Sequence, residues 1–121
     1  MPIILVVDDD PTVRAMTHLF LKKKGYSVIE ATNGLEAEAI ALATTFDLIL
    51  LDVMMPKQDG YNTCINLRAK GYVGQILLVS ALDYLSGETK AKRCGANGYL
   101  PKPISAEVLY NFVSQAVNAH G

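Results

Sequence analysis

Two apolar runs of this chain lead directly into carboxylates. Residues 48–51 precede Asp52, and residues 3–7 precede Asp8 and Asp9. If the two runs are neighbouring strands, the three carboxylates converge at one end of a sheet. Like charges this close raise one another's pKa and repel, unless a hard divalent cation takes oxygen ligands from them. The spacing therefore predicts a Mg²⁺ site.

Two further polar side chains follow apolar runs in the same way. Ser80 ends the run 76–79, and Lys102 follows the short run 98–100. Carboxylates, a hydroxyl, an ammonium group and a divalent cation together suit phosphoryl transfer, in which the protein positions the group and stabilises its oxygens. A carboxylate can itself be the nucleophile and form an acyl phosphate. Taken singly, the serine is an ordinary strand end and the lysine an ordinary loop residue.

These side chains need elements that bring them together. The five runs 3–7, 27–31, 48–51, 76–79 and 98–100 are predicted strands, and a helix is predicted after each. Runs 3–7 and 48–51 lack polar alternation, which is typical of strands covered on both faces. Strict alternation of strand and helix predicts a doubly wound α/β domain with a parallel sheet and right-handed crossovers. Ligands of such sheets bind beyond the carboxyl ends of the strands.

Helix signals support this order. Asp10 precedes Pro11 as a cap, Asn33 precedes Glu36, and Ser105 can cap the last helix. Helical spacing predicts apolar faces on the first, third and last helices, formed by Val13, Met16 and Phe20, by Tyr61, Cys64 and Ile65, and by Leu109, Phe112, Val113 and Ala116.

Composition limits the function classes. The chain has 121 residues, is 50% hydrophobic and carries a net charge of −1, so we expect one compact domain over residues 1–121. The sequence contains no stripe of basic residues, so it gives no reason to expect direct binding to nucleic acid. No apolar run approaches a membrane span, and the start lacks the features of a signal peptide, so we expect a cytoplasmic protein. Cys64 and Cys94 fall in predicted helices, where we expect them buried and unlinked.

Four motifs occur in order: Val6 to Asp10, Asp52 to Pro56 with Asp59-Gly60, Ser80-Ala81, and Tyr99 to Pro103. Together they closely resemble the receiver domain of two-component response regulators, in a stand-alone form similar to chemotaxis receivers. The resemblance covers essentially the whole chain. It implies a flavodoxin-like five-stranded sheet in the order 2-1-3-4-5.

The resemblance also implies residue roles. Asp52 would be the phosphoacceptor. Asp8 and Asp9 would hold Mg²⁺ with Asp52 and the backbone carbonyl of Met54. The remaining implied roles are phosphoryl contacts from Ser80 and Lys102, a switch formed by Ser80 and Tyr99, and a cis peptide before Pro103.

The implied partners are a sensor histidine kinase or a histidine phosphotransfer protein. A downstream protein would bind the face formed by the fourth helix, fifth strand and fifth helix, without membrane insertion. The chain would catalyse its own phosphorylation and dephosphorylation in a phosphorelay but turn over no independent small molecule. His18 and His120 are poor phosphohistidine candidates, because neither lies near the carboxylates in this fold.

Two alternatives remain open at this point. A Mg²⁺-dependent phosphohydrolase with an aspartyl nucleophile would need a general acid near Asp52, and Met54 cannot serve. A non-enzymatic flavodoxin-like binding module would need a phosphate-cradling loop after the first strand. Asp8, Asp9 and Asp10 would repel a phosphate there.

Overall fold

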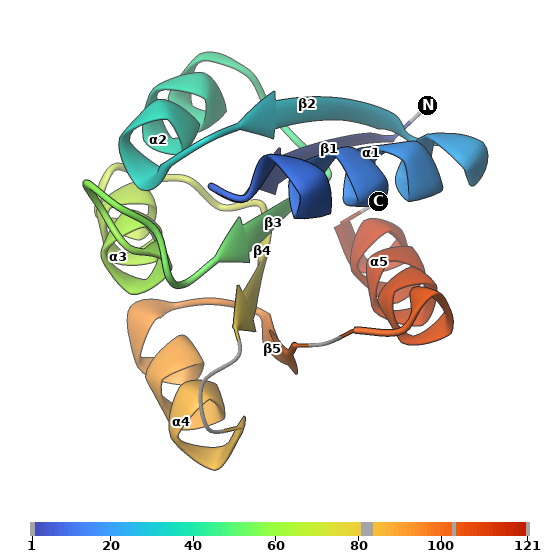
Figure 1. Ribbon diagram of the computed structural model, residues 1–121. Coiled ribbons are helices and arrows are strands. Elements are labelled where there is room, and N and C mark those ends of the chain that lie inside the picture. The colour runs from blue at the N-terminus through green and yellow to red at the C-terminus, as the bar shows by residue number, and fades with distance from the viewer. Residues whose placement is uncertain (1, 81–83, 103, 121) are drawn as a thin grey trace.

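The computed structural model describes residues 2–80, 84–102 and 104–120. Five strands alternate with five helices (Figure 1). The strands are β1 (Ile3–Val7), β2 (Ser27–Ala31), β3 (Leu48–Asp52), β4 (Gln75–Ser80) and β5 (Gly98–Pro101). The helices are α1 (Pro11–Lys23), α2 (Gly34–Ala43), α3 (Gly60–Ala69), α4 (Tyr84–Cys94) and α5 (Ala106–His120).

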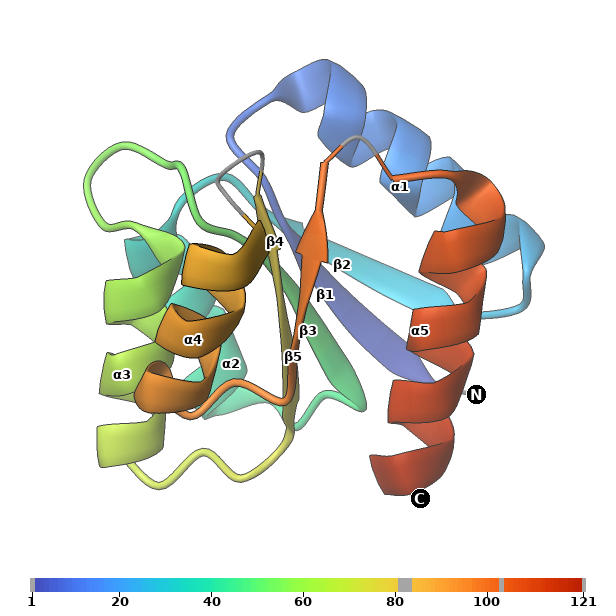
Figure 2. The same cartoon turned by 90° about the horizontal axis from the view of Figure 1, so that it is seen from below.

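The strands form one parallel sheet in the order β2-β1-β3-β4-β5, which confirms the predicted topology. Figure 2 shows α1 and α5 on one face of the sheet and α2, α3 and α4 on the other. In β3, Ile49 and Leu51 belong to the core under α2, α3 and α4, whereas Leu48 and Leu50 belong to the core under α1 and α5. Successive side chains of a strand point to opposite faces, so a run without polar alternation fills both cores.

The predicted helix caps are confirmed. The Asp10 carboxylate accepts hydrogen bonds from the backbone of Thr12 and Val13, which fixes the start of α1 just beyond β1. Asn33 caps α2 through the backbone N–H of Glu36, and the Ser105 hydroxyl accepts from the backbone N–H of Val108 in α5.

The predicted apolar faces were partly wrong. On α1 the buried side chain is Leu21, while Met16 is 68% exposed and Val13 is 36% exposed. These two residues border an open groove between α1 and α5, and none of the described elements covers them. Ile65 and Phe112 also lie largely exposed, because each helix turns a different side chain to the core.

Two further predictions concern the state of the two cysteines and the presence of a membrane-spanning helix. Cys64 and Cys94 are both buried and free, as predicted. Within the part of the chain that the structure describes, no helix is both long and apolar enough to cross a membrane.

Candidate functional site

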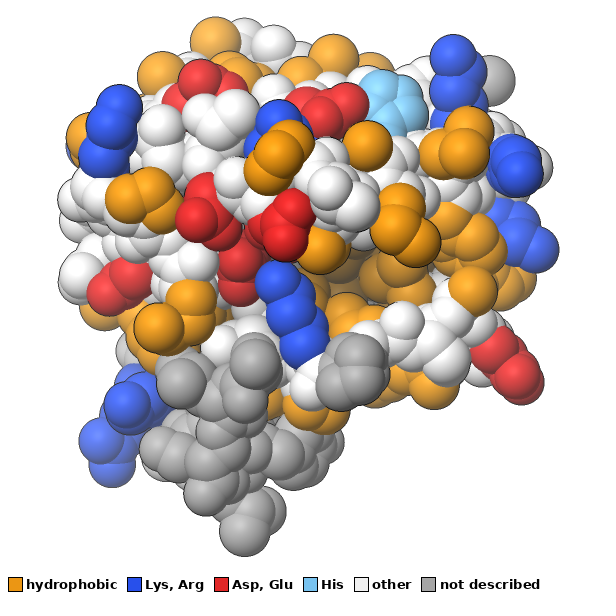
Figure 3. Space-filling model, viewed as in Figure 1, with side chains coloured by type: hydrophobic (Ala, Val, Ile, Leu, Met, Phe, Trp, Pro, Cys, Tyr) orange, Lys and Arg blue, Asp and Glu red, His pale blue; other side chains and the backbone are white. Residues whose placement is uncertain are grey.

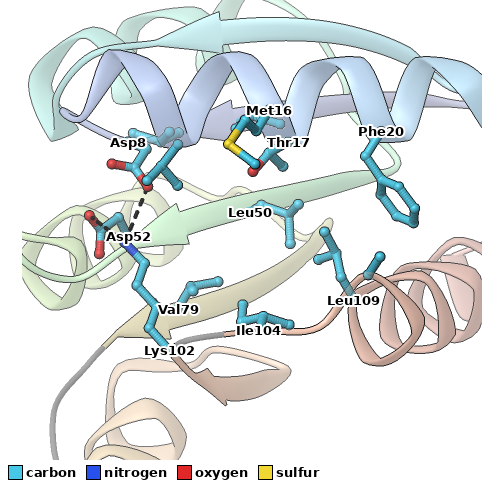
Figure 4. Close-up of a pocket in the computed structure, with 14 residues that line it drawn as sticks. Asp8, Met16, Thr17, Phe20, Leu50, Asp52, Val79, Lys102, Ile104 and Leu109 are labelled. Carbon is cyan, nitrogen blue, oxygen red and sulfur yellow. Dashed lines mark hydrogen bonds and ion pairs between the residues drawn. The ribbon is translucent and has the colours of Figure 1, made fainter.

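Three predicted site residues meet at the carboxyl end of the sheet. The Lys102 ammonium lies 3.2 Å from Asp8 Oδ2 and 3.4 Å from Asp52 Oδ2 (Figure 4). The three side chains come from the ends of β1, β3 and β5, which are 44 or more residues apart along the chain. Asp8 and Asp52 are almost fully buried. The parallel register therefore places two carboxylates and one cation in a single crevice.

The site includes a cluster that fits a hard cation. Asp8, Asp9 and Asp52 each offer a carboxylate oxygen, and these oxygens lie within 4.8 Å of one another. Asp9 is exposed, so the cluster opens to water on one side. Oxygen donors with free access to water match what Mg²⁺ requires.

The charges in this crevice perturb one another. Burial raises the pKa of Asp52 to about 6, the Lys102 ammonium opposes that change, and the Asp8 charge adds to it. Burial alone would lower the pKa of Lys102, but the carboxylates of Asp52 and Asp8 raise it above its usual value. Asp52 is thus a carboxylate that is costly to ionise in the folded chain without a further cation.

The backbone of Asp52 leaves no room for a side chain at residue 60. A Cβ on Gly60 would lie 2.5 Å from the Asp52 carbonyl oxygen, so only glycine fits there. The N–H of Gly60 donates to the Val53 carbonyl at 2.9 Å, and the N–H of Met54 donates to the Asp52 carboxylate. The Met54 side chain itself is 60% exposed. The start of α3 is therefore packed directly against the candidate phosphoacceptor.

The loop between β3 and α3 contains a strained turn. The N–H of Gln58 donates to the Pro56 carbonyl at 2.7 Å across Lys57, which is the only non-glycine residue with positive φ (68°) among the described residues. Such three-residue turns are rare and cost about 1–3 kcal/mol. The surrounding structure must hold this conformation.

A partly buried polar network holds the loop, and sequence reasoning missed it. Gln58 donates to both Glu38 and Thr63 at 3.0 Å. Asn66 donates to Gln58 at 3.1 Å, and the Lys70 ammonium pairs with Glu38. These residues come from α2, the loop and α3. The one available signal was a glutamate in the middle of an alanine-rich helix.

Arg14 was also missed. Its guanidinium donates to the Asp8 carbonyl at 2.7 Å and pairs with Glu30 at 2.8 Å. Glu30 in turn contacts the His18 ring. The hydrogen bond from Arg14, which lies on α1, thus holds the backbone of Asp8 in place.

Other predicted site residues lie close by in the fold. Ser80 ends β4 next to the Asp52 strand and is fully buried, and its carbonyl accepts from the N–H of Lys102 at 2.7 Å. Tyr99 is buried in the core under α3 and α4. The predicted cis peptide at Pro103 lies outside the described residues, as do Ala81 and the side chain of His120.

Comparison with protein families gives one match over most of the chain. Residues 4–114 match the model of the response regulator receiver domain. A DNA-binding dual master transcriptional regulator, RpaA of Synechocystis, is 37% identical over 111 residues, which cover 90% of this chain and 46% of that protein. The response regulator MprA of Mycobacterium avium is 42% identical over 106 residues, covering 88% of this chain and 46% of that protein. The chain thus spans about half the length of the curated relatives it matches.

Solved structures of similar fold cover nearly the whole chain. The chemotaxis protein CheY4 of Vibrio cholerae has a TM-score of 0.89 and 31% identity, covering 96% of this chain and 98% of that one. The receiver domain of the sensor histidine kinase PA1611 of Pseudomonas aeruginosa has a TM-score of 0.89 and 26% identity, covering 97% of this chain and 98% of that one. That structure is described with a magnesium ion coordinated in the active site cleft.

Proposed function

This chain belongs to the response regulator receiver domain family, and from that membership we propose that it accepts a phosphoryl group on Asp52. The donor is a phosphohistidine of a sensor histidine kinase or of a histidine phosphotransfer protein. The observation that carries the proposal is the position of Asp52: buried, at the end of the central strand, and 3.4 Å from the Lys102 ammonium.

The transfer follows from groups on this chain. A carboxylate oxygen of Asp52 attacks the phosphorus, the P–N bond of the phosphohistidine breaks, and its electron pair returns to the imidazole. Lys102 supplies positive charge to the phosphoryl oxygens as they approach, and the hydroxyl of Ser80 donates a hydrogen bond to them.

Asp8, Asp9 and Asp52, with the Met54 carbonyl, would hold Mg²⁺, whose charge offsets the repulsion between the carboxylates and the phosphoryl group. The grouping of the three carboxylates supports this ligand set. Asp8 already has Lys102 as a partner, so we assign it mainly a supporting role and give Asp9 and Asp52 the direct contacts.

Output would pass through a change of packing at the β4 and β5 ends. Contact between the new phosphoryl group and Ser80 favours one of two packings at the end of β4, and Tyr99 adjusts its packing in response. The face of α4, β5 and α5 then binds a downstream protein. The phosphoryl group can shift this equilibrium only by the difference in its contacts with the two states.

The test is intact-mass spectrometry after incubation with acetyl phosphate and Mg²⁺. We expect one added phosphoryl group on the native chain and none on Asp52→Asn, which keeps the side-chain volume. Excess EDTA should abolish the reaction. Unchanged modification of Asp52→Asn would refute Asp52 as the acceptor, and unchanged modification in EDTA would refute the metal requirement.

A further inference from the structure

The crevice at Asp52 continues into an apolar groove that phosphoryl transfer from a protein donor does not explain. The groove and the crevice form one cavity of about 770 Å³ between α1 and α5. Figure 3 shows the hollow with an apolar floor beside the acidic side chains and a basic side chain. Its volume lies in the range of roughly 300–1,000 Å³ that is typical of sites for small organic molecules.

The lining separates into a charged end and an apolar remainder. Among the described residues that line the cavity, the charged ones are Asp8, Asp52 and Lys102, and Figure 4 shows all three at one end. Phe20 and Leu109 lie at the other end. Between them, the sheet supplies the floor with Val6, Leu50 and Val79, and the walls include Val13, Met16, Thr17, Ile104 and Ala106.

This division matches a molecule with a charged head and an uncharged apolar chain. Lys102 and the proposed cation site suit an anionic head, and a phosphoryl group is the anion that the chemistry at Asp52 consumes. The strand residues described at the floor of the groove present aliphatic side chains to the apolar chain of such a molecule. An apolar chain buried there gains roughly fourfold in affinity per methylene, since about 0.8 kcal/mol per methylene is set against about 1.4 kcal/mol for each tenfold.

We propose that the groove binds the chain of an acyl phosphate with a medium or long apolar acyl group, and that this molecule phosphorylates Asp52 directly. The inference rests on the proposed function of Asp52 and specifies a substrate class for it. A carboxylate oxygen of Asp52 forms the new bond to phosphorus, the bond between phosphorus and the acyl oxygen breaks, and the electron pair leaves with a fatty carboxylate. No oxidant, reductant or added proton is needed.

The experiment compares acetyl, butyryl, hexanoyl and octanoyl phosphate as donors with Mg²⁺ present, below the concentrations at which they form micelles. The measured quantity is the second-order rate constant of Asp52 phosphorylation, followed by intact mass. We expect octanoyl phosphate to react at least about tenfold faster than acetyl phosphate, because part of its chain is buried. Equal rate constants along the series would overturn the inference.

Two variants fill the groove from opposite walls. Ala106→Trp acts from α5 and Thr17→Trp from α1, and both should reduce the octanoyl-to-acetyl ratio to near one. Ala15→Trp is the matched control, since Ala15 is exposed on α1 and does not line the groove. It should keep the full ratio. A ratio unchanged in the filled variants would mean that the chain binds elsewhere, and would overturn the proposal.

A measurement on the unmodified chain removes the dependence on variant folding. Octylphosphonate, which cannot donate its phosphoryl group, should shift the methyl NMR signals of Leu50 and Leu109 in the groove. The signals of Leu67, in the core on the other face of the sheet, should stay in place. Equal shifts in both cores, or none, would count against the groove. If no acyl phosphate modifies Asp52 at all, the proposed function fails; if acetyl phosphate does so without chain preference, only this inference fails.

Discussion

Replacing Asp52 with asparagine should stabilise the metal-free protein at neutral pH. The substitution keeps the shape of the side chain and its ability to accept the hydrogen bond from Met54 N–H. It removes the negative charge of Asp52, a residue that is 5% exposed and lies beside Asp8. A group that is functionally required but costly to fold is expected at a phosphoryl-transfer site.

The magnitude follows from the pKa of Asp52. Its value is about 6 in the folded protein and 3.8 for an ordinary aspartate. At about 1.36 kcal/mol per pH unit, this gap corresponds to about 3 kcal/mol of lost stability once pH exceeds the folded value. The Lys102 ammonium lowers the pKa of Asp52, so its attraction is already included in this gap. The asparagine variant should therefore gain about 3 kcal/mol at pH 8.

The sign of the pH dependence is fixed. Between pH 3.8 and about 6 the folded state binds more protons at Asp52 than the unfolded state, so the stability of the native chain falls as pH rises through this window. The advantage of the asparagine variant should be near zero below this window and complete above it.

Urea denaturation of both proteins in EDTA, at pH 4 and at pH 8, measures the effect. A lower midpoint for Asp52→Asn at pH 8, or an equal difference at both pH values, would refute the reasoning. Adding Mg²⁺ should then raise the midpoint of the native chain more than that of the variant, because a ligand that binds the folded state alone adds to its stability.

Three further substitutions test the packing around Asp52. Gly60→Ala should cost about 3 kcal/mol in urea denaturation, because its Cβ would meet the Asp52 carbonyl at 2.5 Å; Gly71→Ala, which meets nothing within 4 Å and only strains a positive φ, should cost about 1 kcal/mol. Gln58→Leu should cost about 1–2 kcal/mol because it removes the hydrogen bonds that Gln58 donates to Glu38 and Thr63, and amide exchange should accelerate over residues 53–59. Unchanged exchange would contradict the network. Hydrogen bonds, chiefly from Lys70, hold the pKa of Glu38 below its usual value of 4.5. The stability that ionised Glu38 contributes is therefore present at neutral pH and lost on acidification. Glu38→Gln should remove this loss, so the urea midpoint should fall less on acidification than it does in the native protein.

The fold was predictable because local and long-range signals agree. A run such as residues 48–51, apolar at every position, is buried on both faces only in a covered parallel sheet, and the caps at Asp10 and Asn33 mark where helices begin. The meeting of Asp8, Asp52 and Lys102 followed from the same rule, since parallel strands bring their carboxyl ends to one edge.

The apolar face of α1 was harder to predict. The spacing of Val13, Met16 and Phe20 correctly indicates one side of a helix, but it does not indicate whether another element covers that side. Coverage depends on how closely α5 approaches α1, and the long-range packing of α5 on β3 and β4 sets that distance. The same three residues are then core in one arrangement and groove wall in another.

The network behind the β3 to α3 loop was hidden for a related reason. Glu38, Gln58 and Lys70 are ordinary surface residues by type, and only their side-chain directions on two adjacent helices and a loop bring them together. Once assembled, this partly buried network joins α2 and α3 to Gln58, the neighbour of the strained Lys57 in the loop that follows Asp52. Residue types and spacing in the sequence identify the side chains that can react with a phosphoryl group. The side chains that hold them in place can be identified only from contacts between elements. Substitutions in the second set should therefore change the metal affinity and loop dynamics of the site while leaving every reactive side chain present.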